Sequence, residues 1–204
     1  GGKNWETVKE MSNIAISNMT FPDAKNGFVI TEIMETTEGK AVSSVVIFKT
    51  VDGGKSWKSQ KFTGVSSDIK GQMIYSIHFK DDKNGWVLVS GGLDGPIYTD
   101  LFKTVDGGKT WQKSYSHKES GFAKVAFFDD KTGVVLPAFW DLMPKIYRTT
   151  DGGNTFDQMV KGTNLHFNAF HFIDAQTGFA YNQKGIVKST DGGKNWTSVE
   201  DIAA

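Results

Sequence analysis

The sequence predicts an all-β fold, a β-propeller of four-stranded antiparallel blades, because two motifs alternate along a chain of strand-like segments. An octapeptide occurs four times in the 204 residues, as TVDGGKSW at 50–57, TVDGGKTW at 104–111, TTDGGNTF at 149–156 and STDGGKNW at 189–196. A second motif, F-x-D-x-x-[N/T]-G, begins at Phe21, Phe79, Phe127 and Phe172. The octapeptides recur at a spacing of roughly 40 to 55 residues, which is the length of one propeller blade.

The segments between the motifs are expected to be short strands. IYSIHF at 74–79, GWVLVS at 85–90 and IYRTT at 146–150 are rich in β-branched and aromatic residues and are bounded by Asp, Asn and Gly. Each repeat then supplies four strands: a ends at the F-x-D motif, b follows its Gly, c enters the octapeptide and d leaves it. Such units each expose an apolar face, so they are stable only when stacked around a ring.

The octapeptide is expected to form the tight turn between strands c and d. Gly53 and Gly54 can adopt a positive φ without a Cβ clash, and the Asp52 carboxylate can accept hydrogen bonds from backbone N–H groups of the turn. Four blades repeat this carboxylate, whereas an enzyme needs its nucleophile or general base once. We therefore assign a structural role to Asp52, Asp106, Asp151 and Asp191.

The pattern S/T-x-D-x-G-x-T/S-W/F in these octapeptides is similar to the Asp-box, or BNR repeat. The chain thus resembles the Asp-box β-propellers of sialidases, sortilin-type receptors, some large glucanases and photosystem II assembly factors. The segments GWVLVS and IYRTTDGGNTF are similar to those of the assembly factors. The resemblance covers essentially the whole chain and implies the fold, but not the function, because enzymes, receptors and assembly factors all carry the box.

We expect one domain over residues 1–204, with blades at roughly 11–64, 65–118, 119–162 and 163–204. Residues 1–10, GGKNWETVKE, nearly duplicate GGKNWTSVED at 192–201, so they are expected to form the outer strand of a fifth repeat. This strand either belongs to a larger propeller or closes a compact ring, and we favour the larger propeller.

The connections between strands b and c are the expected recognition loops. They are assigned to 31–44, 90–101, 137–145 and 182–185, and the last and shortest is all that the repeat requires, so the longer ones can carry a function. Trp140 is the one Trp of six that the repeat does not explain; it is either a loop anchor or a ligand contact. The candidate binding residues are Trp140, Asp141, Tyr98, Asp94 and Asp100.

Two histidines are candidates for the lining of the central channel. His78 and His171 each precede the Phe of an F-x-D motif, so they occupy equivalent positions in two blades. A pair of His without a third ligand makes a poor metal site, and we expect neither a metal nor another cofactor. The aspartates of the F-x-D motifs are expected to form turns: Asp23, Asp81, Asp129 and Asp174.

Composition excludes several classes of function. The 23 basic residues balance the 23 acidic ones without a basic run, so nucleic acid is an unsuitable partner. Cysteine is absent, which excludes disulfides and thiolate chemistry, and no apolar run approaches the roughly 20 residues of a membrane span. Sialidases grip their substrate with three arginines, whereas Arg148 is the only arginine here. The Lys-rich, Cys-free composition and the resemblance together favour an extracytoplasmic bacterial protein.

The favoured function is a non-enzymatic recognition or scaffold module that binds a protein, peptide or glycan through the b–c loops. Two alternatives stay open. A glycoside hydrolase other than a sialidase needs two carboxylates about 5–9 Å apart, which could come from Asp94, Asp100, Asp141, Glu32 and Glu35. An assembly protein like the photosystem II factor is the other alternative, although that family is expected to use an arginine-rich surface.

Overall fold

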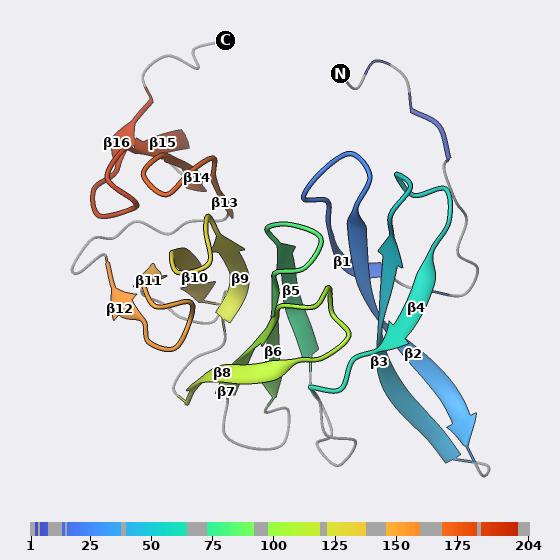
Figure 1. Ribbon diagram of the computed structural model, residues 1–204. Helices are drawn as coiled ribbons and strands as arrows, with labels where there is room; N and C mark the ends of the chain where they lie inside the picture. Colours follow the sequence, from blue (N-terminus) through green and yellow to red (C-terminus); the bar gives the residue numbers. More distant parts are fainter. Residues whose placement is uncertain are drawn as a thin grey trace.

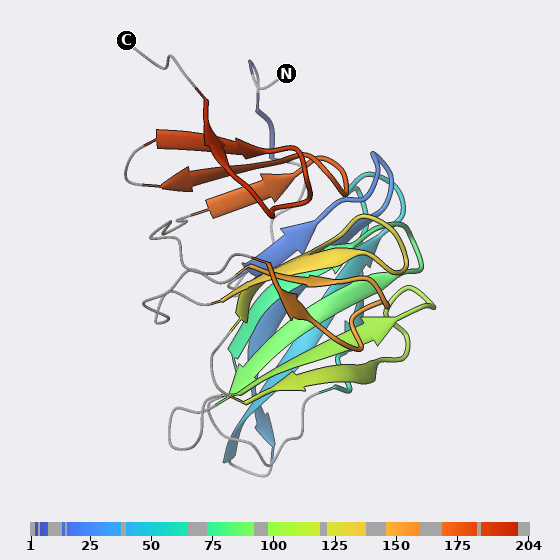
Figure 2. The same cartoon turned by 90° about the vertical axis from the view of Figure 1, so that its left-hand side faces the viewer.

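The computed structural model describes residues 3, 5–7, 14, 16–37, 40–64, 73–91, 98–118, 122–137, 146–159, 169–182 and 185–199. In this part of the chain, strands β1 to β16 form four antiparallel four-stranded sheets. The sheets stand side by side around a common axis as the blades of a propeller (Figure 1, and turned by 90° in Figure 2). The predicted fold class is confirmed.

Each blade is built from four strands that are consecutive in the sequence and in the sheet. Blade 1 contains β1 (Ile16–Thr20), β2 (Gly27–Thr37), β3 (Lys40–Thr50) and β4 (Lys58–Lys61). Blade 2 contains β5 (Met73–Phe79), β6 (Gly85–Gly91), β7 (Tyr98–Thr104) and β8 (Gln112–His117). Blade 3 contains β9 (Phe122–Phe127), β10 (Gly133–Pro137), β11 (Tyr147–Thr149) and β12 (Asp157–Gln158). Blade 4 contains β13 (Ala169–Phe172), β14 (Gly178–Asn182), β15 (Gly185–Ser189) and β16 (Thr197–Ser198).

The hydrophobic core lies between blades rather than inside one. One cluster joins blades 1 and 2 through residues such as Phe28 and Phe79. A second joins blades 2 and 3 around Trp86 and Phe127, and a third joins blades 3 and 4. Since each sheet is only one layer thick, it buries its apolar faces against its neighbours, as the repeat pattern requires.

The first blade differs from its prediction at the b–c connection. Residues 31–44 are not an inserted loop: β2 and β3 pair continuously from Gly27↔Thr50 to Thr37↔Lys40. This part of the sequence, TEIMETTEGKAVSS, is rich in Thr, Ile and Val, which favour extended backbone. The insertion therefore lengthens a hairpin, which projects beyond the rest of the blade in Figure 1.

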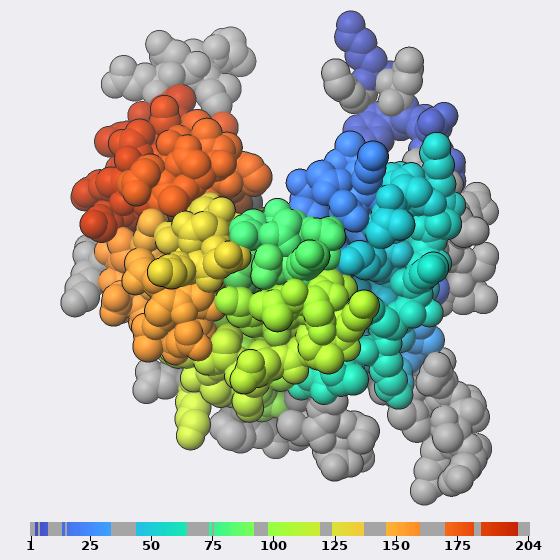
Figure 3. Space-filling view, viewed as in Figure 1, coloured from blue at the N-terminus to red at the C-terminus, as the bar shows by residue number. Residues whose placement is uncertain are grey.

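The blades do not meet all the way around the axis. Blades 1 and 4 are separated by a gap in Figure 3, whereas blades 1 to 4 pack against one another in sequence. Of residues 1–10, the structure describes Lys3 and Trp5–Thr7, none of them in a strand. The outer strand of a fifth repeat thus remains a prediction.

Candidate binding site

The four octapeptides form tight turns held by their own side chains. In the first, the Thr50 hydroxyl donates to Asp52 Oδ1 (2.8 Å) and accepts from the Gly54 N–H (2.9 Å). Asp52 also accepts from the Ser56 N–H (2.9 Å) and hydroxyl (2.6 Å). The Trp57 indole N–H donates to the Gly54 carbonyl (2.8 Å). The same Thr/Ser–Asp–Gly bonds recur in the other three turns.

The chemistry of these turns keeps the carboxylates ionised and bonded. Gly53 and Gly54 have φ of 74° and 93°, a region that favours glycine. Hydrogen bonds from the Ser56 side chain, the Ser56 N–H and the Thr50 hydroxyl lower the pKa of Asp52 to about 2. Bonds from Thr155 lower the pKa of Asp151 in the same way. A general acid or base needs a pKa near the working pH, so these groups suit a scaffold role.

The octapeptides and the F-x-D turns lie at the same end of the blades. The Gly53 N–H donates to the Lys25 carbonyl (2.9 Å), and the Gly107 N–H donates to the Lys83 carbonyl (2.9 Å). Because strands alternate in direction, the b–c connections must lie at the opposite end. The propeller therefore has an octapeptide end and a b–c end.

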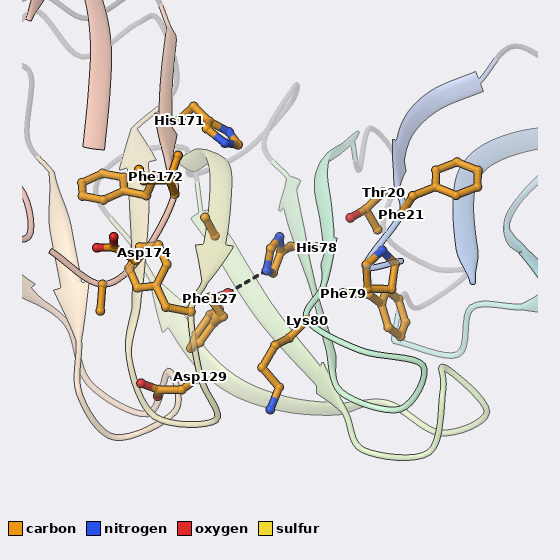
Figure 4. Close-up of a pocket in the computed structure, with 15 residues that line it drawn as sticks. Thr20, Phe21, His78, Phe79, Lys80, Phe127, Asp129, His171, Phe172 and Asp174 are labelled. Carbon is orange, nitrogen blue, oxygen red and sulfur yellow. Dashed lines mark hydrogen bonds between the residues drawn. The ribbon is translucent and has the colours of Figure 1, made fainter. Parts of the chain in front are cut away.

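A cavity of about 590 Å³ opens where the first strand of each blade reaches the octapeptide end. Its lining includes Thr20 from blade 1, His78 and Lys80 from blade 2, and His171 from blade 4 (Figure 4). The turn aspartates Asp129 and Asp174 complete its polar groups.

Most charged groups in the cavity already have partners. Asp129 Oδ1 accepts the N–H groups of Lys131 (2.7 Å) and Thr132 (2.6 Å), and Asp174 makes the equivalent bonds in its own turn. Lys80 Nζ lies 2.6 Å from Asp130 Oδ1 and 3.3 Å from Asp81 Oδ2. These bonds hold the turns together, and those of the two aspartates are made by Oδ1.

The two histidines lie on strands on either side of β9, and both line the cavity. His78 Nε2 lies 2.8 Å from the Phe127 carbonyl oxygen. A carbonyl only accepts, so Nε2 carries the proton and donates this bond. Burial lowers the pKa of His78, which keeps the ring neutral at pH 7, whereas His171 is exposed.

The candidate residues near the b–c connections divide into two groups. Trp140, Asp141 and Asp94 lie outside the described residues. Tyr98 and Asp100 are described, and their predicted position in an inserted loop is wrong, because both belong to β7. Strand β7 starts at Tyr98 and pairs with β6 from Gly85↔Thr104 to Gly91↔Tyr98.

Asp100 combines burial with an incomplete set of partners. Its exposed fraction is 8%, and its Oδ2 lies 3.3 Å from Lys113 Nζ on β8. Its Oδ1 is buried and has no hydrogen-bond partner among the described residues. The indole nitrogen of Trp86, which is 0% exposed and packs between blades 2 and 3, also lacks a partner in this part of the chain. Asp100 lies near the end of β7 that emerges from the b–c connection.

The other residues considered for chemistry are Glu32, Glu35 and Arg148. Glu32 is exposed, and the side chain of Glu35 lies outside the described residues. The single arginine, Arg148, donates to the carbonyls of Ala175 and Gly192, both at 3.0 Å. Among the residues described, no group of three or more His, Cys, Asp or Glu could hold a metal ion.

Sequence reasoning missed the cation that precedes each octapeptide. Lys49, Lys103, Arg148 and Lys188 occupy this position. The first three reach across to the next blade, where Lys49 Nζ donates to the Asp82 carbonyl (2.8 Å). The signal was present, because a Lys or Arg stands before all four octapeptides.

Comparison with known proteins supports the fold and indicates a relationship. No protein-family model matches the chain. It is 30% identical over 105 residues to the photosystem II stability/assembly factor HCF136, chloroplastic, of Cyanidioschyzon merolae, covering 45% of this chain and 22% of that protein. It also matches the structure of YCF48 bound to D1 peptide, with a TM-score of 0.58, 18% identity, and coverage of 90% of this chain and 53% of the other. An ancestral GH74 enzyme matches with a TM-score of 0.53 and 15% identity, covering 100% of this chain and 26% of the other.

These matches show a β-propeller that is similar in part of its sequence to a photosystem II assembly factor. The chain spans about a fifth of that curated relative and about half of the YCF48 chain. Within the described ranges, the structure contains no helix with the length and apolarity that a bilayer crossing requires.

Proposed function

We propose that this protein is a non-enzymatic recognition module that binds a protein or peptide segment at its b–c end. The observation that carries the proposal is the Asp100 carboxylate, which is buried with one oxygen lacking a hydrogen-bond partner. An unpaired buried carboxylate oxygen costs free energy unless a donor reaches it. The N–H groups of an extended peptide are suitable donors.

The b–c end suits this role better than the cavity at the octapeptide end. Lys80, Asp129 and Asp174 in the cavity are already bonded within turns or to other charges. Among the described residues, Asp100 by contrast has one ion pair, to Lys113 at 3.3 Å. Tyr98 lies on the same face of β7, two residues away. Asp94, Trp140 and Asp141 belong to the segments predicted as b–c connections.

The comparisons favour a peptide among the possible ligands. The YCF48 structure is described as bound to D1 peptide, and HCF136 is described as a stability and assembly factor. We therefore propose, more specifically, that the protein helps to assemble a larger complex. Since Arg148 is used between blades 3 and 4, recognition here would depend on Asp100 and its aromatic neighbours rather than on an arginine cluster.

A location outside the cytoplasm remains part of the proposal. The curated relative is described as chloroplastic, and the composition is compatible with export. Fractionation of cells that produce the protein, with detection by antibody, tests this point; recovery in the cytosol alone would contradict it.

Titration of a D1 peptide into the protein, followed by fluorescence anisotropy, tests the function. Asp100→Asn should weaken binding by roughly 10- to 150-fold, because a hydrogen bond to a charged group contributes about 1.5–3 kcal/mol. The exposed Asp157→Asn is the matched control and should leave the Kd unchanged. Failure of the D1 peptide to bind would contradict the peptide assignment, and equal affinities for both variants would contradict the site.

A further inference from the structure

The outer face of blade 4 carries apolar side chains at the positions that are buried between the other blades. We call it the leading face and define it by Phe179 and Tyr181 on β14 and Ile186 and Lys188 on β15. Tyr181 and Ile186 are 52% and 36% exposed. The matching apolar residues of blades 1 to 3 are at most 8% exposed: Phe28, Ile30, Ile47, Trp86, Leu88, Leu101, Val134, Leu136 and Ile146.

Blade 1 has the complementary face, which we call the trailing face, defined by Met19 and Phe21. These side chains are 55% and 46% exposed. Their equivalents in blades 2 to 4 are again at most 8% exposed, because each packs on the preceding blade: Ile77, Phe79, Val125, Phe127, Phe170 and Phe172. The leading and trailing faces border the gap between blades 4 and 1 in Figure 3.

The internal junctions each join one leading face to one trailing face. Aromatic rings stack across the first two, Phe28 on Phe79 with centroids 3.4 Å apart and Trp86 on Phe127 at 3.8 Å, whereas Val134 packs in the cluster of the third. A strand-c cation donates to a carbonyl of the next F-x-D turn at the first and third junctions, Lys49 to Asp82 at 2.8 Å and Arg148 to Ala175 at 3.0 Å.

The two outer faces each hold one half of this junction. Lys188 Nζ lies 5.7 Å from the centroid of Phe179, as Lys49 lies 4.9 Å from that of Phe28. Among the described residues, however, Lys188 Nζ has no carbonyl acceptor of the kind that Lys49 has. On blade 1, the carbonyl of Ala24 occupies the position of the Asp82 carbonyl next to the octapeptide glycine.

We propose that the leading face of one copy docks on the trailing face of a second copy. Phe179 then stacks on Phe21 of the second copy, and Lys188 donates to its Ala24 carbonyl, which repeats the internal junction. Apolar patches with matching polar groups mark interaction surfaces, and a head-to-tail contact can close into a ring.

Sedimentation velocity across a range of protein concentrations tests the proposal. The wild-type chain should form a dimer. Two variants each block one face: Phe179→Asp with Lys188→Glu blocks the leading face, and Phe21→Asp blocks the trailing face. The dimer of each variant alone should have a Kd at least about 30-fold higher than that of the wild type, as expected on losing an aromatic anchor.

An equimolar mixture of the two blocked variants distinguishes this arrangement from other dimers. Each mixed pair retains one intact junction, so the mixture should regain a 1:1 dimer that neither variant forms alone. Val105→Asp, at an exposed apolar residue of an octapeptide turn, is the control and should stay dimeric. A monomeric wild type, a blocked variant that dimerises like the wild type, or a mixture that stays monomeric would each overturn the proposal. Circular dichroism establishes that every variant is folded.

Discussion

At the scale of single residues, the same amino acid lies in two different environments. Asp106 in an octapeptide is bonded at both oxygens by the hydroxyls of Thr104 and Thr110 and by a backbone N–H. Asp100, six residues earlier, is buried with one oxygen unpaired. The bonds of Asp106 are local and can be anticipated from the octapeptide alone. The burial of Asp100 depends on β8 and the neighbouring blade, so the sequence alone could not predict it.

Replacing Asp106 by Ala should lower the free energy of unfolding by about 1–3 kcal/mol, because the Thr110 N–H and two hydroxyls lose their acceptor. Thermal and urea denaturation measure this loss. Asp157→Ala, at an exposed aspartate on β12, should have little effect. A loss of D1 peptide binding in Asp106→Ala without a loss of stability would contradict the scaffold role.

The turn carboxylates should also make the protein sensitive to acid. The pKa of Asp52 is lowered to about 2 from 3.8, chiefly by the Ser56 side chain, and in Asp106 the bonds from Thr110 and Thr104 outweigh burial to give about 2. The unfolded chain therefore binds more protons between about pH 4 and pH 2. The stabilisation is complete above pH 4 and is lost as the pH falls through this window.

Thermal denaturation from pH 5 to pH 2 checks this expectation. The melting temperature should fall most steeply below pH 4, and Asp106→Asn should reduce the steepness because it removes one titrating group. A melting temperature that rises or stays constant below pH 4 would contradict the assigned pKa directions.

At the scale of elements, strands and turns were predictable where they repeat, and the connections were not. The F-x-D and octapeptide turns have local signals in Gly and Asp. The extension of β2 and β3 across residues 31–44 has only a compositional signal, which a variable loop shares. The cations before the first three octapeptides reach across to the next blade, so their role became visible only once the blades were assembled.

Arg148 and Lys188 allow a matched test of that cation. Arg148→Ala should lower the free energy of unfolding by about 1–3 kcal/mol, because the Ala175 and Gly192 carbonyls lose a charged donor. In the monomeric Phe21→Asp background, Lys188→Ala should cost less than about 1 kcal/mol, since mainly its contact with Phe179 is lost. Urea denaturation measures both changes, and equal losses would show that the carbonyl bonds contribute little.

At the scale of the whole molecule, our proposal assigns stability to one end of the propeller and recognition to the other. Octapeptide and F-x-D turns are bonded to one another within each blade at one end of the propeller. The b–c end varies from blade to blade and carries Asp100 with its unpaired oxygen. The repeat could reveal this division, but it could not reveal the ligand, because recognition depends on the residues in which the blades differ.

Hydrogen exchange with and without a D1 peptide tests the central claim, that recognition occurs at the b–c end. Bound peptide should slow exchange in residues 90–101 and 137–145, because new hydrogen bonds and burial protect these amides. Exchange in the octapeptides at 50–57, 104–111, 149–156 and 189–196 should stay unchanged. Protection confined to the octapeptide turns or to the cavity around His78 and His171, or no protection at a saturating peptide concentration, would contradict the claim.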